Sequence, residues 1–143
     1  MSAAKLYTPQ LLAAAMELAD YPPIETALLH AEARSPTCGS RVAVDLVLDQ
    51  QHRIERVGLK VTACAIGQGS AAIFARHAPG RSPDDIRAAA ASMAAWLEEQ
   101  GPAPRWPDLS LIAPARDYRA RHGAMLAPWR AAIAALSSVP ASR

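Results

Sequence analysis

Apolar residues recur along the chain with two different spacings. Residues 27–34 form a first strand-like run, and residues 41–48 and 56–62 alternate apolar with more polar side chains. Alternation with a period of two is typical of strands that bury one face. Residues 49–53, between the second run and the third, are short enough to form a hairpin connection. We therefore expect the second and third strands to pair in antiparallel orientation.

Most of the remaining apolar residues recur at helical spacing. Helices are expected after Thr8 and after Ser82, because each is a good N-cap that is followed by proline. A further helix is expected to begin just after Cys64. These three helices are expected to end where proline or glycine interrupts the pattern, near residues 21, 77 and 101.

The C-terminal part of the chain completes the predicted fold. A short helix is expected around residues 108–112, and a final helix carries an apolar stripe over residues 126–136. Pro128 lies inside this stripe, so the final helix either kinks there or begins near Ala127. The order of these elements predicts an α+β fold, with a three-stranded antiparallel sheet and helices packed on one side. The length predicts a single domain over 1–143, whose tail from 137 to 143 is expected to fray.

Composition and charge narrow the classes of function. The formal net charge is +2, from 15 basic and 13 acidic residues, which gives no indication of a nucleic-acid partner. The basic cluster over residues 116–122 is interpreted as a solvated surface rather than a phosphate site. No apolar run reaches the ~20 residues of a membrane span, and no signal peptide is evident. We therefore expect a cytoplasmic protein without a membrane partner, and the sequence leaves a homo-oligomer open.

The two cysteines are the first candidates for chemistry. Cys38 lies in the loop-like segment 35–40, and Cys64 ends the third strand. Without an export signal, a reducing compartment keeps both thiols free. A hairpin of the second and third strands returns position 64 to the level of residues 38–40. We therefore expect both thiols at one end of the sheet, where they can share a metal ion or exchange sulfur.

Histidine is the residue type that best completes such a site. Of the 4 histidines, His30 lies in a strand, His52 in the distal turn and His77 at a helix end. His122 lies at the start of the final helical region, from which it could reach the same end of the sheet as the cysteines. The spacing alone is a weak signal, because the chain has no C-x-x-C and no H-E-x-x-H motif. A thiol enzyme with Cys64 as nucleophile and His122 as base has only this proximity to support it.

Three segments carry a more specific signal through their order. They are residues 36–40 (PTCGS), 62–71 (TACAIGQGSA) and 122–127 (HGAMLA). Together they resemble the IscU/NifU-like iron–sulfur cluster scaffold family, including its SufU-like branch, whose pattern runs N-P-x-C-G-D, G-C-x-x-x-x-A-S and H-C-x-x-L-A. The likeness extends from about Tyr7 to Leu136.

The resemblance implies an IscU/NifU-like fold and a non-enzymatic role in iron–sulfur cluster assembly, in which a cysteine desulfurase supplies sulfur. It implies that Cys38, Cys64 and His122 bind zinc, iron or a transient [2Fe–2S] cluster. Two positions depart from the family pattern, since Ser40 replaces an aspartate and Gly123 replaces the third cysteine. Asp117 or water is then the expected fourth ligand of a zinc ion. A stable [2Fe–2S] cluster would need a ligand from another chain or from a small thiol.

Two functions stay open at this point. The first is a scaffold or accessory protein that binds metal through Cys38, Cys64 and His122 and accepts sulfur on one of its cysteines. The second is a binding or regulatory module that keeps the fold, with an empty or zinc-filled site. Ser40 and Gly123 favour the second function, whereas the two cysteine motifs and their order favour the first.

Overall fold

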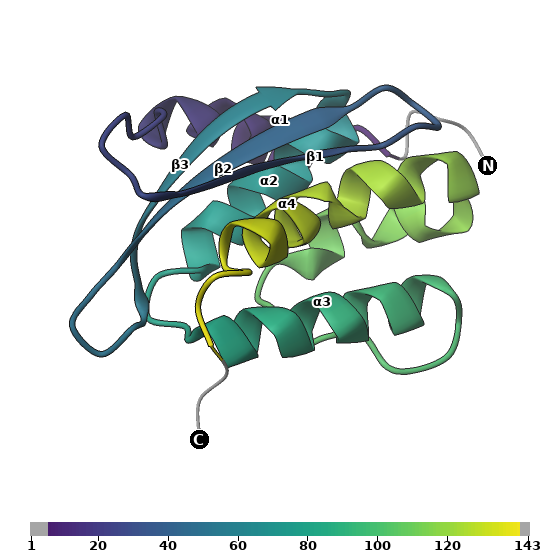
Figure 1. Ribbon diagram of the computed structural model, residues 1–143. Helices are drawn as coiled ribbons and strands as arrows, with labels where there is room; N and C mark the ends of the chain where they lie inside the picture. Colours follow the sequence, from purple (N-terminus) through teal and green to yellow (C-terminus); the bar gives the residue numbers. More distant parts are fainter. Residues whose placement is uncertain (1–5, 141–143) are drawn as a thin grey trace.

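The chain folds into one antiparallel sheet and a set of helices, in the expected order (Figure 1). The structure is a computed structural model and describes residues 6–140. Its elements are α1 (Pro9–Met16), η2 (Glu17–Asp20), β1 (Leu29–Arg34), β2 (Arg41–Leu48), β3 (Ile54–Thr62), α2 (Ala65–His77), α3 (Pro83–Leu97), η3 (Leu109–Leu111), η4 (Ala113–Asp117), η5 (Arg119–Arg121) and α4 (His122–Ala135). The elements labelled η are short 3-10 helices. The predicted α+β class is confirmed.

The three strands form a sheet in the order β1-β2-β3, and both pairs are antiparallel. The register sets Arg41 opposite Thr62 at one end of the β2–β3 hairpin. β1 begins at Leu29 rather than at residue 27, because the Ala27 N–H donates to the Ile24 carbonyl in a turn. Among residues 6–140, no backbone segment pairs with the outer edge of β1.

Helices α2 and α4 pack beneath the sheet, and α3 packs beneath α4 (Figure 1). Helix α1 packs against α2, where Leu11 fills the space beside Gly69. The face of the sheet that α2 and α4 cover buries the branched residues of β2 and β3, among them Val44 and Leu59. The segments that carry Cys38 and Cys64 are therefore positioned by the ends of the strands, between β1 and β2 and between β3 and α2.

The opposite face of the sheet is crossed by residues 22–24. A Cβ at Gly58 would lie 2.8 Å from the Pro22 carbonyl oxygen, so glycine is what permits this close approach. The Ile24 N–H donates to the Asp45 carboxylate over 2.9 Å. Towards the loop of residues 35–40, the same face carries exposed side chains.

Helix starts agree with the predicted caps, except in α4. Thr8 caps α1, and Ser82 forms a capping box with Asp85 at the start of α3. Helix α4 begins at His122, not near Ala127, and continues through Pro128. Of the two alternatives that Pro128 left open, a start near Ala127 is therefore wrong. Just before Pro128, the Ser70 hydroxyl on α2 donates to the Met125 carbonyl of α4 over 2.6 Å, which ties the two helices together.

The C-terminal segment follows α4 back towards α3. The Arg87 guanidinium donates to the carbonyls of Leu136 and Val139, at 3.1 and 2.8 Å. The rest of the predicted frayed tail, residues 141–143, lies outside the described residues. Within the described part of the chain, no helix has the length and apolarity needed to cross a membrane.

Candidate functional site

Cys38 lies exposed in the tight loop that joins β1 to β2. The Ser35 N–H donates to the Ser40 carbonyl and the Gly39 N–H donates to the Ser35 carbonyl, each over 2.8 Å. Gly39 has a φ of 70°, a left-handed conformation that glycine adopts without strain. The Cys38 Sγ lies 3.3 Å from the Ser35 Oγ and 3.1 Å from the Ser40 Oγ. The loop thus holds the sulfur between two hydroxyl groups.

The environment of Cys38 favours the thiolate. Burial raises the pKa of the thiol, but hydrogen bonds from Ser35 and Ser40 and the charge of Arg121 together lower it more. The net result is a pKa below the usual value for cysteine. Since the thiolate is the nucleophile and the metal ligand, the lowered pKa increases the fraction of Cys38 in its reactive form.

Cys64 lies at the same end of the sheet, just after the Thr62 that pairs with Arg41. It is half-buried and occupies the N-cap position of α2, although its side chain makes no capping hydrogen bond. A Cβ at Gly67, in the first turn of α2, would lie 3.5 Å from the Ala124 Cβ and 3.8 Å from the Ser40 Oγ. The first turns of α2 and α4 therefore lie against the loop that carries Cys38.

Gly123 has no room for a side chain. A Cβ at this position would lie 2.9 Å from the Ser35 Cβ and closer still to the Ser35 Oγ. Because the same Oγ is 3.3 Å from the Cys38 Sγ, position 123 lies beside the Cys38 sulfur. Ser35 thus fills the space into which a third thiol would project from α4.

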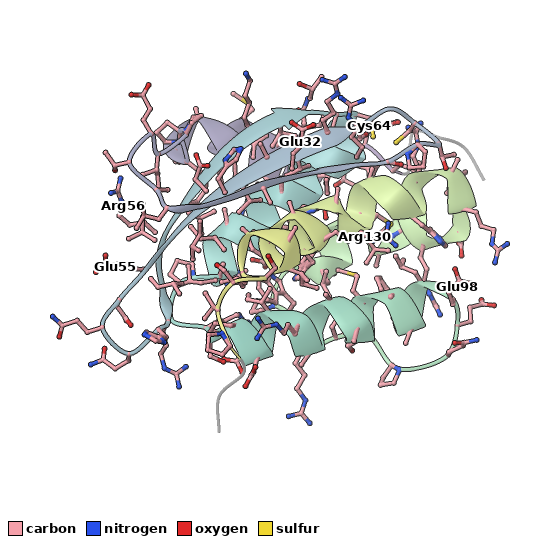
Figure 2. The ribbon with its side chains drawn as sticks, viewed as in Figure 1. Glu32, Glu55, Arg56, Cys64, Glu98 and Arg130 are labelled. Carbon is pink, nitrogen blue, oxygen red and sulfur yellow. The ribbon has the colours of Figure 1, made fainter. Side chains whose placement is uncertain are left out.

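His122 begins α4, and its ring turns to the backbone of η4. Its Nε2 lies 2.6 Å from the Arg116 carbonyl oxygen. His122 and Asp117 line one hollow of about 210 Å³, and His122 also lines a second hollow with Ser35 and Gly123. Glu98 and Arg119 contribute to both hollows, but neither cysteine does. Figure 2 shows Cys64 and Glu98 towards the same side of the molecule.

The predicted ligands do not form a ready metal site. Within residues 6–140, no three histidine, cysteine, aspartate or glutamate side chains are placed to hold a metal ion together. The imidazole of His122 is hydrogen-bonded to the Arg116 carbonyl, and Gly123 has no side chain that could bind a metal ion. Asp117 lies with His122 in a hollow that no cysteine lines. Metal binding by all three predicted ligands would require His122 to release the Arg116 carbonyl.

The other histidines lie elsewhere, as expected. His30 pairs with Asp45 on the face of the sheet that residues 22–24 cross. His52 lies in the β2–β3 turn with a φ of 61°. His77 ends α2, where its Nε2 lies 2.7 Å from the Asp108 carboxylate. None of these three was predicted to be a ligand.

The sequence did not indicate the role of Ser35. Its hydroxyl contacts both Cys38 and the site of the missing third cysteine, yet only the folded chain brings residues 35 and 123 together. The role of Arg121 was also missed, because the basic cluster was interpreted as a solvated surface. Arg121 directly precedes α4, and its positive charge lowers the pKa of Cys38. Its place next to His122 in the sequence was the one signal that could have indicated this role.

Comparison with known proteins gives a consistent result. No protein-family model matches the sequence, and no curated protein matches it. Among solved structures, a nitrogen-fixing NifU-like protein (N-terminal) from Brucella abortus has 32% identity and a TM-score of 0.83, covering 92% of each chain. A putative iron–sulfur cluster assembly scaffold protein for the SUF system from Fervidobacterium islandicum has 18% identity and a TM-score of 0.76, covering 92% of this chain and 96% of its own.

A third structure, a hypothetical protein, has 17% identity and a TM-score of 0.67, and covers 90% of this chain and 97% of its own. At these lower identities, the second and third structures show a common fold. The Brucella abortus protein shares both fold and sequence over nearly the whole length of the two chains. The chain therefore belongs to the NifU-like (N-terminal) family, within the IscU/NifU-like group that its three motifs resemble.

Proposed function

We propose that this protein takes part in iron–sulfur cluster assembly as an accessory that accepts sulfur from a cysteine desulfurase. The exposed Cys38 sulfur, held between two serine hydroxyls, is the observation that carries the proposal. Membership of the NifU-like family supports the general role. In this proposal the protein is a cytoplasmic assembly protein rather than an enzyme, and the desulfurase is its partner.

Sulfur acceptance requires a nucleophilic thiolate and a donor persulfide. The Cys38 thiolate attacks the outer sulfur of a donor persulfide, R–S–SH. A new S–S bond forms to Cys38 as the S–S bond of the donor breaks, and R–S⁻ leaves with the electron pair. The proton stays on the transferred sulfur, so the product is Cys38–S–SH. The lowered pKa of Cys38 increases the thiolate fraction that starts this step.

Metal binding is a separate part of the proposal. Cys38, Cys64 and His122 are the residues we propose for iron or zinc, and a [2Fe–2S] cluster would be cargo rather than a resident cofactor. Two thiolates and one imidazole leave an open site, so a cluster would need ligands from a second molecule. The sulfur transfer described above requires neither ion nor cluster.

Sulfur transfer to Cys38 is the direct test. The protein is incubated with a cysteine desulfurase and L-cysteine without reductant, and intact-mass and peptide mass spectrometry locate the added sulfur. We expect one added sulfur atom on Cys38 and its loss in Cys38→Ser, because serine cannot form a persulfide. Cys64→Ser is the matched control and should still receive one sulfur atom on Cys38. Sulfur found on Cys64 in both the wild type and Cys38→Ser would contradict the assignment.

Ser40 and Gly123 favour a second candidate, a binding or regulatory module with a zinc-filled or empty site. It is distinguished by metal analysis of protein purified without oxygen. Stoichiometric zinc that is lost in Cys38→Ala and Cys64→Ala, with no sulfur accepted from the desulfurase, would favour this function. Visible absorption after incubation with iron, cysteine and the desulfurase would favour cluster assembly.

A further inference from the structure

Three cations line the exposed face of the sheet beside the Cys38 loop. Arg34 ends β1 and lies directly opposite Arg41, the first residue of β2. Arg41 lies opposite Thr62 of β3, and Lys60 is two residues from Thr62 on the same face. We name Arg34, Arg41 and Lys60 the cationic strip. All three residues are exposed, and Figure 2 shows Glu32, which borders the strip, and Cys64 towards the same end of the sheet.

The cationic strip is electrostatically unbalanced. Residues directly opposite in an antiparallel pair have Cβ atoms about 4.5–5.5 Å apart, and like charges in such a pair repel. Arg34 has one compensating group, the Glu32 carboxylate at 3.5 Å. Arg41 and Lys60 have no ion-pair partner anywhere in residues 6–140. Within residues 6–140, Arg41 therefore faces Arg34 without an anionic partner of its own.

The position of the strip relates it to the reactive sulfur. Arg34 immediately precedes the loop of residues 35–40, and Arg41 immediately follows it. A partner that delivers sulfur to Cys38 must bring a sulfur atom into bonding distance of this loop. Because Arg34 and Arg41 are the residues on either side of the loop, a protein surface broad enough to cover the end of the sheet also reaches their side chains. A negatively charged surface at that point would neutralise the opposed pair and accelerate encounter.

We propose that the cationic strip is the docking surface for an acidic protein surface that surrounds the sulfur-bearing cysteine of the desulfurase. This inference rests on the proposed function, because it identifies how the partner recognises the Cys38 loop. Charge complementarity is the argument for the occupant. The strip aligns the donor over the loop through long-range attraction and salt-bridge contacts, whereas the chemistry stays at Cys38.

A nucleic acid is a poorer match for this surface. Proteins that follow a phosphate backbone typically neutralise about 6–10 phosphates. The strip offers three cations with the Glu32 carboxylate beside them, and the net charge of the chain is only +2. An acidic protein surface, with separate carboxylates and space for Glu32, suits this pattern better.

The test reverses charge on the strip without altering the loop. The affinity and association rate of the full chain for a desulfurase are measured for wild type and for Arg41→Glu/Lys60→Glu. We expect the double variant to bind about tenfold or more weakly, mainly through a slower association, and the wild-type rate to fall with added salt. Arg56→Glu/Arg105→Glu makes the same change in net charge at two exposed sites away from the Cys38 loop, and should bind within about twofold of wild type.

Folding and function are separated by two further readouts. In Arg41→Glu, the new carboxylate faces Arg34, so the thermal unfolding midpoint should stay the same or rise. If Arg41→Glu/Lys60→Glu does not fold, Arg41→Gln/Lys60→Gln replaces it in the binding measurement. Cys38→Ser should keep its affinity for the desulfurase while it accepts no sulfur. Strip variants that bind and receive sulfur like wild type would overturn the docking inference alone. Binding to duplex DNA that the variants abolish, with desulfurase affinity unchanged, would also overturn it, whereas absence of sulfur transfer to the wild type would overturn the proposed function.

Discussion

Gly123 and Ser35 form a matched pair beside Cys38. The glycine leaves space that the buried serine occupies, and the Cys38 thiol donates to the serine hydroxyl oxygen. The family pattern has cysteine where this chain has Gly123, so the substitution does more than remove one ligand. It places a neutral hydroxyl where a thiol would lie, and the site changes from three potential thiolates to two.

Restoring a thiol at position 123 should therefore require a second change. Gly123→Cys alone should destabilise the protein by about 1–3 kcal/mol, because its Cβ would overlap Ser35. Ser35→Gly/Gly123→Cys should recover much of this loss, since the nearest remaining atom, the residue 35 Cα, lies 3.6 Å from the new Cβ. Urea unfolding of the four proteins, with Ser35→Gly as control, measures the coupling. Additive effects of the two substitutions would show that they do not share this space.

The C-terminal end of α2 is held by a charged network. Arg76 pairs with Glu17 of η2 and donates to the Asp108 carboxylate over 2.7 Å, and His77 contacts the same carboxylate. Hydrogen bonds from His77 and Arg76 lower the pKa of Asp108 below its usual value. Asp108 adopts a φ of 67° just before η3, a conformation that aspartate and asparagine tolerate. The network thus joins the end of α2 to η2 and to the segment just before η3.

Asp108→Asn should lower the free energy of unfolding at neutral pH by about 1 kcal/mol or less, because the network is partly exposed. Since the pKa of Asp108 is lower in the folded state, the carboxylate stabilises the protein fully above its unfolded pKa. This stabilisation is lost as the pH falls through the folded pKa. Urea unfolding of wild type and variant across pH 2–7 measures the difference, which should shrink below about pH 4. A difference that grows with acidity would contradict the assigned role.

Phe74, Trp106 and Trp129 form an aromatic cluster in the core of the molecule. Trp106 stacks on Phe74 with ring centroids 5.7 Å apart, and it meets Trp129 edge-on at 5.2 Å. Its Nε1 donates to the Ile73 carbonyl over 3.0 Å, and the Arg81 guanidinium lies 3.9 Å above its ring. Trp106 comes from the long connection after α3, so the cluster fastens that connection to α2 and α4.

Trp106→Ala should cost about 3–5 kcal/mol of unfolding free energy, because the change removes the ring from the centre of the cluster. Denaturant unfolding should give a lower midpoint with an unchanged slope, as expected for a lost packing interaction in a cooperative fold. A loss smaller than about 1 kcal/mol would mean that the connection does not support the core.

The strand pattern allowed the sheet and the position of the cysteines to be predicted. Alternation over residues 41–48 and 56–62 defines the hairpin, and the hairpin places Cys38 and Cys64 at one end. The start of α4 was not predictable from Pro128 alone, because α4 packs against α2, β1 and β2, and these contacts depend on distant parts of the chain. Ser35 escaped prediction for a similar reason, since its role depends on a contact with distant Gly123. The arrangement of His122 depends on a backbone carbonyl whose position the sequence does not specify.

The outer edge of β1 has a consequence for the protein at high concentration. A strand with unpaired N–H and C=O groups is a template on which another chain can add a strand and begin to aggregate. β1 has only 6 residues, and its exposed positions are His30, Glu32 and Arg34. A short edge with charged side chains opposes such addition. Glu32 and Arg34 therefore act as a safeguard against aggregation at the β1 edge, with which no other part of residues 6–140 pairs.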